Sequence, residues 1–124
     1  MLCSPGPHLI PISTATRAGS DTLVFALGHG RDSLAGLRDD PNAAICLMGE
    51  EVAFTACGSA SVIREQLDAA PRIAALALRV DRVQDHLAEG RTEMLDGARW
   101  RRLDPAIAEA DAAILTELQA LVRE

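Results

Sequence analysis

The sequence contains no lysine and no tyrosine, and it has few aromatic residues of any kind. All 12 basic residues are arginine, which excludes Schiff-base chemistry and leaves arginine as the side chain for binding an anion. With 2% aromatic content and a net charge of −6, the chain lacks the stacking surfaces and the basic face of a nucleic-acid binder. We therefore expect a small-molecule partner and no nucleic acid.

The chain also lacks a long apolar run, a signal peptide and a local metal-binding motif. No stretch approaches the length of a membrane span, and the N-terminus has no charged segment followed by an apolar one. Cys3, Cys46 and Cys57 are odd in number and have no CxxC spacing, so they fit neither a disulfide framework nor a zinc site. We expect a cytoplasmic protein with no membrane association and no metal.

What the sequence does contain is a series of short apolar segments separated by turn residues. Their pattern predicts strands at residues 8–16, 22–27, 43–48, 52–63 and 72–84. A short helix should begin at a cap near Asp32 and end at Asp40-Pro41, and residues 64–70 favour another short helix. The hairpin connections indicate a mainly β fold with flanking helices, a small antiparallel split barrel formed by residues 1–124 as one domain.

The last segment has the clearest helical pattern in the chain. Asp104 suits an N-cap and Pro105 the first helical position, so we expect an amphipathic helix over about residues 104–123. Its apolar residues recur every three to four positions and form one stripe: Leu103, Ile107, Ala110, Ile114, Leu118 and Leu121. The stripe must cover either the barrel or a second subunit. The preceding residues favour a short strand around Trp100, which we expect to anchor this helix to the barrel.

The turn around Gly28 and Gly30 is the strongest candidate for a binding site. An apolar strand runs into a short helix there, which directs backbone N–H groups and the positive end of the helix toward one point. Arg31 lies just inside the turn and can bind a phosphate through two parallel hydrogen bonds. The pattern favours an anion site, although an ordinary strand–helix connection has the same sequence.

The order of these segments resembles the pyridoxamine 5′-phosphate oxidase-like superfamily, whose members are FMN-binding split barrels. The resemblance covers roughly residues 5–85. It rests on PHLIPI at residues 7–12, on the strand–turn–helix segment at residues 25–41, and on Gly58-Ser59-Ala60. It implies a split barrel that forms a homodimer, with FMN in a groove at the subunit interface.

The resemblance also assigns residues to the two ends of the cofactor. Three residues of the first strand would lie against the isoalloxazine ring: Ile12, Ser13 and Thr14. The family commonly binds the FMN phosphate through Ser-Arg-Lys, but the matching residues here are Arg-Asp-Ser at positions 31–33, so Asp32 brings a negative charge. The phosphate ligands that we expect are Arg17, Arg31, Ser33 and the backbone N–H groups of His29, Gly30 and Arg31.

Two further differences bear on the activity. True pyridoxamine 5′-phosphate oxidases have a lysine near the position of Ala15 and a flavin-contacting glutamine at that of Ala53. We therefore expect an FMN-dependent oxidoreductase with an unknown small-molecule substrate, and not a true pyridoxamine 5′-phosphate oxidase. Two alternatives stay open: a cofactor-free dimeric split barrel that acts as a binding or structural module, and a relative that binds the deazaflavin F420 or haem. No residue is assigned a catalytic role.

Overall fold

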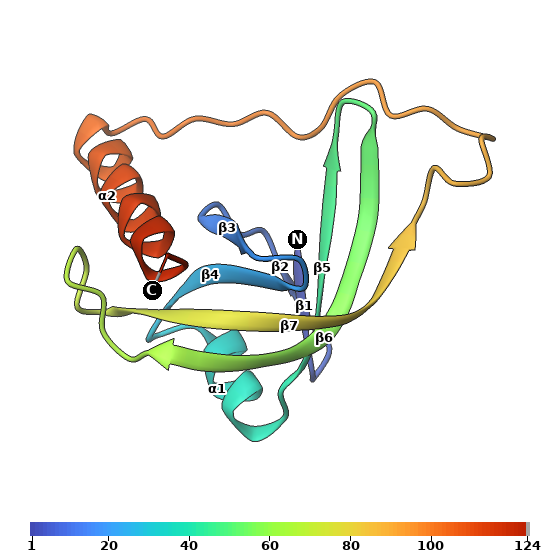
Figure 1. Cartoon of the computed structure of the whole chain (residues 1–124). Coiled ribbons are helices and arrows are strands. Elements are labelled where there is room, and N and C mark those ends of the chain that lie inside the picture. Colours follow the sequence, from blue (N-terminus) through green and yellow to red (C-terminus); the bar gives the residue numbers. More distant parts are fainter. Residues whose placement is uncertain (124) are drawn as a thin grey trace.

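The computed structural model describes residues 1–123 as one antiparallel sheet with two helices (Figure 1). The elements in chain order are β1 Leu2–Ser4, β2 His8–Ile10, β3 Ala15–Ala18, β4 Thr22–Gly28, α1 Asp32–Asp39, β5 Asn42–Gly49, β6 Val52–Arg64, β7 Ile73–Asp85 and α2 Pro105–Leu121. The strands lie in the order β2-β1-β5-β6-β7-β4-β3, and each neighbouring pair is antiparallel. The predicted mainly β class and C-terminal helix are confirmed.

A short connection between the two edge strands curls this sheet. β2 and β3 follow each other in the sequence but lie at opposite edges of the sheet, and only residues 11–14 join them. Because an extended chain covers at most ~3.6 Å per residue, this connection holds the two edges within roughly 18 Å of each other. The edges do not pair, so the sheet forms a barrel that is split along one side. This is the architecture that the sequence predicted.

The strand predicted at residues 8–16 is wrong as a single element. Pro11 has no N–H group to continue the ladder, and the segment divides into β2 and β3 on either side of the crossing. β1 was not predicted, because it is only 3 residues long and too short to show a pattern. The other strands agree with their predicted bounds to within one residue at each end.

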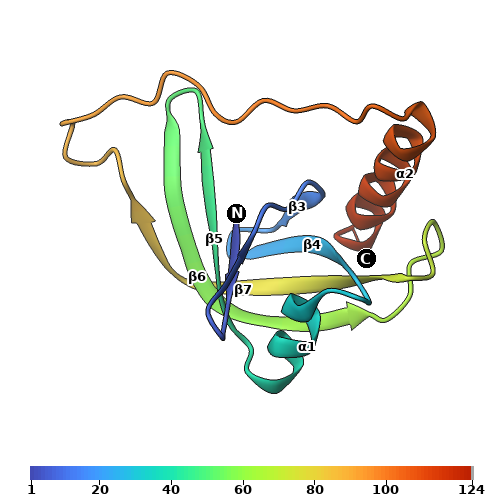
Figure 2. The same cartoon turned by 180° about the vertical axis from the view of Figure 1, so that it is seen from behind.

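The interior of the barrel holds an apolar core that α1 closes at one end. Phe25 and Leu76 are fully buried there, and Leu34 of α1 packs into the same core. Figures 1 and 2 show α1 at the end of the barrel opposite the free tip of the β5–β6 hairpin. α1 begins near Asp32 as predicted, but the expected side-chain cap is absent. Arg31 is the N-cap residue, no side chain caps this helix end, and Asp32 is its first helical residue.

The second helix packs on the outer face of the sheet through half of its apolar stripe. Asp104 caps α2 as predicted, because its carboxylate accepts a backbone N–H of the first turn at 2.9 Å. Ile114 and Leu118 are buried against β4 and β7, whereas Leu103 and Ile107 are 91% and 46% exposed. The stripe therefore covers the barrel only with its C-terminal half. Neither helix within residues 1–123 is long and apolar enough to cross a membrane.

A long connection, residues 86–104, joins β7 to α2 and passes over the tip of the β5–β6 hairpin (Figures 1 and 2). At the tip, the N–H of Glu51 donates to the carbonyl of Met94 at 3.0 Å, and a side chain at Gly97 would overlap the carbonyl of Met48. The strand predicted around Trp100 is absent from this connection. Trp100 is 62% exposed, so it does not anchor α2 to the barrel as predicted.

The loop between β6 and β7 attaches α2 to the barrel. The predicted helix at residues 64–70 is absent, because the N–H groups of this loop bond to another element: Asp68 and Ala69 donate to the carboxylate of Glu117 at 2.9 and 2.7 Å. Arg64 lies 3.5 Å from the same carboxylate. Burial alone would raise the pKa of Glu117, but the hydrogen bonds and Arg64 outweigh burial and lower it.

Replacing Glu117 should loosen α2. In Glu117→Gln the loss of charge-assisted hydrogen bonds is expected to cost about 1–2 kcal/mol of unfolding free energy near neutral pH. Folding lowers the pKa of Glu117, so its contribution to the unfolding free energy is complete above the pKa that it has in the unfolded chain. That contribution is lost as the pH falls through the pKa of the folded protein. Urea unfolding should therefore show a difference in unfolding free energy between wild type and variant that narrows as the pH falls below the ordinary titration range of a glutamate. Glu109→Gln, exposed on the same helix, is the control, and a difference that stays constant with pH would contradict this role.

Substitution of Gly58 should destabilise the barrel. Gly58 lies at the predicted bend, where the β6–β7 register shifts, and an added Cβ would overlap the carbonyl of Arg79. Overpacking against backbone is expected to cost about 3 kcal/mol or more in Gly58→Ala. Gly49→Ala in the same hairpin is the matched control, because nothing lies within 4 Å of its added Cβ. The midpoint of thermal unfolding should fall only for Gly58→Ala, and equal midpoints would refute the close approach.

Candidate functional site

Four of the predicted site residues meet in one small cavity. It lies between residues 10–14, the end of β4 and the middle of α2, and its volume is about 130 Å³. We call it the Arg31 cavity below. The predicted residues that line it are Ile12, Ser13, Thr14 and Arg31. The crossing between the sheet edges explains this arrangement, because it carries residues 11–14 past the end of β4, where the turn to α1 begins.

The other wall of the Arg31 cavity comes from the C-terminal part of the chain. Arg102 and Asp111 line it, and Nε of Arg102 donates to the Asp111 carboxylate at 2.6 Å. The guanidinium of Arg102 lies over the ring of Trp100, 5.3 Å from its centroid. Two arginines therefore line one small space, and one of them is already paired with a carboxylate.

Backbone hydrogen bonds tie the turn after β4 to the barrel. His29 donates its N–H to the carbonyl of Arg72 at 2.8 Å, and Arg31 donates its N–H within the turn at 3.1 Å. Two of the three N–H groups expected to bind a phosphate are therefore already partnered. Gly30 is exposed, and Ser33 is buried at 2% exposure. The structure therefore does not bring His29, Gly30 and Ser33 together with Arg31 into one phosphate-binding group.

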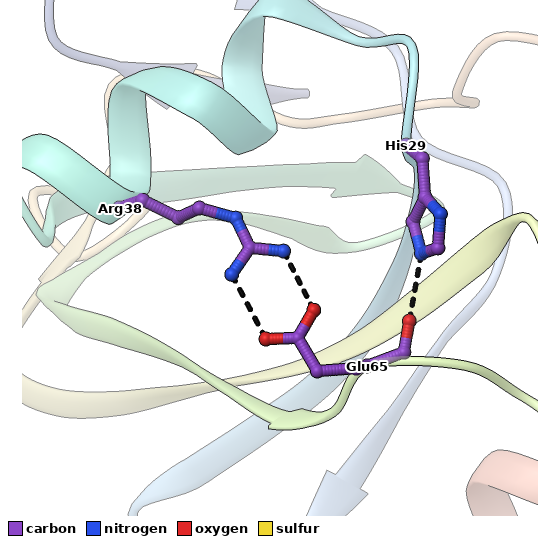
Figure 3. A network of polar contacts seen from close by, with 3 residues as sticks. All are labelled: His29, Arg38 and Glu65. Atoms are coloured by element: carbon purple, nitrogen blue, oxygen red, sulfur yellow. Dashed lines mark hydrogen bonds and ion pairs between the residues drawn. The ribbon is translucent and has the colours of Figure 1, made fainter.

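Figure 3 shows where the side chain of His29 is held. Its Nε2 lies 2.7 Å from the backbone carbonyl of Glu65 and donates a hydrogen bond to it. The carboxylate of Glu65 accepts two parallel hydrogen bonds from Arg38, at 2.9 and 2.7 Å. The bonds from Arg38 lower the pKa of this carboxylate. His29 thus links the turn after β4 to the β6–β7 loop, and its ring does not line the Arg31 cavity.

Arg17 lies in a different cavity, called the hairpin cavity below. This cavity has a volume of about 530 Å³ and lies between the β3–β4 turn and the β5–β6 hairpin. Its apolar walls are formed mainly by Leu23, Val52, Phe54, Val80 and Val83. Nε of Arg17 donates to the carbonyl of Gly19 at 2.7 Å. The predicted pairing of Arg17 with Arg31 is therefore not found, because the two arginines line separate cavities.

The rim of the hairpin cavity is acidic. Asp21, Glu51 and Asp85 line it together with Arg17, and none of these carboxylates forms an ion pair with another residue in the described part of the chain. Ala53, at the position where the family carries a flavin-contacting glutamine, lies in the same wall. Three carboxylates beside one guanidinium disfavour a phosphate dianion in this cavity.

Neither of the two cavities lined by predicted site residues suits a whole FMN molecule. Cavities for drug-sized ligands measure about 300–1,000 Å³. The Arg31 cavity, at about 130 Å³, is smaller and has room for a phosphate-sized anion. The hairpin cavity, at about 530 Å³, is large enough but carries the wrong charge for the phosphate end. The residues present therefore fit the phosphate end of FMN at Arg31, and the Arg31 cavity has no room for the flavin ring as well.

Two solved structures share this architecture. A proposed pyridoxamine 5′-phosphate oxidase from Listeria innocua matches with a TM-score of 0.56 and 17% sequence identity, over 68% of this chain and 85% of the other. HupZ of Group A Streptococcus matches with a TM-score of 0.60 and 12% identity, over 78% of this chain and 88% of HupZ. The chain has the split-barrel fold of the pyridoxamine 5′-phosphate oxidase-like proteins. No protein-family model matches the sequence, and no curated protein shows a significant match.

Two charged residues of the Arg31 cavity, Arg102 and Asp111, were not expected there from the sequence. Asp111 lies three residues before the buried Ile114, so both occupy one face of α2, and this spacing was the available signal. Arg102 follows Arg101 directly, and such an arginine pair can form a small anion patch, but nothing in the sequence placed this pair beside Arg31. Both residues reach the cavity only through the packing of α2 on the barrel.

Removal of the Asp111 carboxylate should strengthen the Arg31 cavity as an anion site. In Asp111→Asn the guanidinium of Arg102 is released from its ion pair, and one negative charge leaves the cavity. We expect inorganic phosphate to bind about 10-fold more tightly, equivalent to about 1.4 kcal/mol, as measured by the phosphate-dependent rise in unfolding temperature. Glu89→Gln removes the same charge from the exposed pair with Arg91 and is the control. Equal phosphate binding by wild type and Asp111→Asn would argue against an anion site.

Proposed function

We propose that this protein is a homodimeric flavoprotein that binds FMN at the subunit interface and acts as an oxidoreductase on a small molecule. The observation that carries this proposal is the convergence of residues 12–14 and Arg31 on one cavity of a split barrel. The Listeria innocua protein of the same fold, itself a proposed pyridoxamine 5′-phosphate oxidase, adds support. The two arginines and the hydroxyl side chains of the Arg31 cavity suit a phosphorylated cofactor.

Each part of the Arg31 cavity has a role in this proposal. The guanidinium of Arg31 binds the phosphate through parallel, charge-assisted hydrogen bonds. Residues 12–14 lie beside the flavin ring, which extends out of the phosphate-sized cavity toward the second subunit. FMN, when bound, supplies hydride-transfer chemistry. The chain itself contributes binding, orientation and the exclusion of water, and no side chain is assigned a role in proton transfer.

A second subunit completes the proposed site. A ligand site usually buries most of its ligand, so the flavin ring needs walls that one copy does not supply. In a two-fold symmetric dimer the same surface of both copies forms the interface, which gives two equivalent sites. Large exposed apolar side chains support such an interface: Leu47, Met48, Val83 and Trp100 are 46%, 53%, 60% and 62% exposed.

A cofactor-free dimeric module is the second candidate function. It is favoured by the state of the phosphate-binding turn, in which the N–H groups of His29 and Arg31 are already bonded and Asp32 follows directly. α2 also forms one wall of the Arg31 cavity and limits its volume. A protein of this kind would keep the split barrel as a binding or structural scaffold without the cofactor.

Addition of FMN followed by desalting distinguishes the two candidates. We expect the wild type to retain a visible flavin band. Arg31→Ala should bind FMN at least about 10-fold more weakly, because hydrogen bonds to charged groups contribute about 1.5–3 kcal/mol each. Arg17→Ala is the matched control and should retain FMN, because Arg17 lines the other cavity. Absorption spectra and titration of flavin fluorescence measure both effects.

The remaining outcomes of this experiment contradict the proposal in different ways. A colourless protein that is dimeric in sedimentation would favour the cofactor-free module. Full FMN occupancy in Arg31→Ala would place the phosphate elsewhere. Uptake of F420 or haem in place of FMN would assign the protein to the deazaflavin- or haem-binding relatives.

A further inference from the structure

Residues 98–103, called the arm below, are exposed along their whole length and rich in arginine. Arg102 is paired with Asp111, but Arg99 and Arg101 form no ion pair with any residue in positions 1–123. Trp100 between them is 62% exposed. A chain with a net charge of −6 therefore presents a local cationic segment that carries a large apolar side chain.

The hairpin cavity has the opposite character. Its walls are apolar, and Val83 in one of them is 60% exposed. Its rim carries the three carboxylates of Asp21, Glu51 and Asp85, none paired with a cation within residues 1–123. At about 530 Å³ it has room for an indole ring. An apolar space with an acidic rim is complementary to a basic segment that presents a tryptophan.

We propose that the arm of a second copy of this chain docks in the hairpin cavity. Trp100 of that copy packs against the apolar walls, and its Arg99 and Arg101 pair with the carboxylates of the rim. This inference rests on the dimer of the proposed function and identifies the surfaces that form its interface. A buried tryptophan flanked by charge pairs is the usual composition of an interface hot spot.

The occupant is a second copy because both ends of the arm are fixed within its own subunit. Just before the arm, Gly97 lies against the carbonyl of Met48 at the hairpin tip, and just after it, Asp104 caps α2. With these contacts in place, no residue of the arm lines the hairpin cavity of its own copy. In a dimer with two-fold symmetry, the arm of each copy docks in the hairpin cavity of the other while the contacts at Gly97 and Asp104 stay in place. The same docking contact then forms twice.

Tryptophan fluorescence tests this docking directly. Trp100 is the only tryptophan and the chain has no tyrosine, so the emission reports on one position. We expect the emission maximum of the wild type to move to shorter wavelength as protein concentration rises, in parallel with dimer formation measured by sedimentation. Dilution should reverse both changes together.

Charge variants identify the docking partner. Arg99→Glu should weaken the dimer at least about 10-fold, because a cation facing the acidic rim becomes a carboxylate. Arg91→Glu, on the same connection and paired with Glu89, is the matched control and should leave the dimer unchanged. Combining Arg99→Glu with Asp85→Arg should restore dimer formation by exchanging the two charges. If Arg99→Glu weakens the dimer and the double variant does not restore it, the pairing of Arg99 with Asp85 is overturned.

The other outcomes separate the docking from the dimer on which it rests. A dimer in sedimentation whose tryptophan emission stays that of an exposed ring would overturn the docking and leave the dimer intact. Short-wavelength emission that does not change with concentration would place Trp100 in its own subunit and also overturn the docking. A monomer at every concentration would contradict both the docking and the dimeric site of the proposed function.

Discussion

The connection at residues 11–14 imposes the constraint on which the rest of the structure depends. It joins strands at opposite edges of one sheet, so the sheet must curl until the edges come close. The curl creates an inside, which holds Phe25 and Leu76, and an outside, on which α2 packs. The curl also brings residues 11–14 past the end of β4. The connection that shapes the barrel therefore also forms one wall of the Arg31 cavity.

The C-terminal third of the chain controls how open that cavity is. α2 is held by two kinds of contact: the apolar packing of Ile114 and Leu118, and the bonds of Glu117 to the β6–β7 loop. The first half of the helix lacks such contacts and approaches the cavity through Asp111 and its partner Arg102. Ile114 has both roles, because it is buried against the barrel and also lines the cavity, so the packing that holds α2 also forms one wall of the candidate site.

The sequence predicted the strands well where burial on two sides left a clear pattern. In β7, Leu76 faces the barrel interior while Ala75 lies beneath α2, and this segment was recognised as a strand. The prediction failed where distant contacts decide the conformation. Ala69 lies in a helix-like stretch, but its N–H bonds to Glu117, a partner 48 residues away, so no helix forms. β1 was missed because three residues give no periodicity.

The candidate site shows the same limit. The resemblance identified residues 12–14 and Arg31, which the fold brings to one cavity. Arg17 is expected beside them because it lies two residues after Ala15, the position of the family's lysine, and alternate residues of a strand share a face. Ala15 and Arg17 do lie in one strand, β3, but Arg17 is next to the β3–β4 turn and lines the hairpin cavity instead. Arg102 and Asp111 line the cavity only because α2 packs on the barrel. Local spacing places Asp111 on the buried face of α2, but it gives no such indication for Arg102.

Charge is distributed in this chain so that complementary groups cannot all meet within one copy. The sequence has 12 arginines against 18 acidic residues, so most cations are expected to find a carboxylate nearby. Four arginines do so within residues 1–123: Arg38, Arg64, Arg91 and Arg102. Arg99 and Arg101 remain on the arm, while unpaired carboxylates surround an apolar cavity beside the hairpin. With the ends of the arm fixed at Gly97 and Asp104, these opposite charges are kept apart in one subunit, and a two-fold pair of subunits is the simplest arrangement that brings them together.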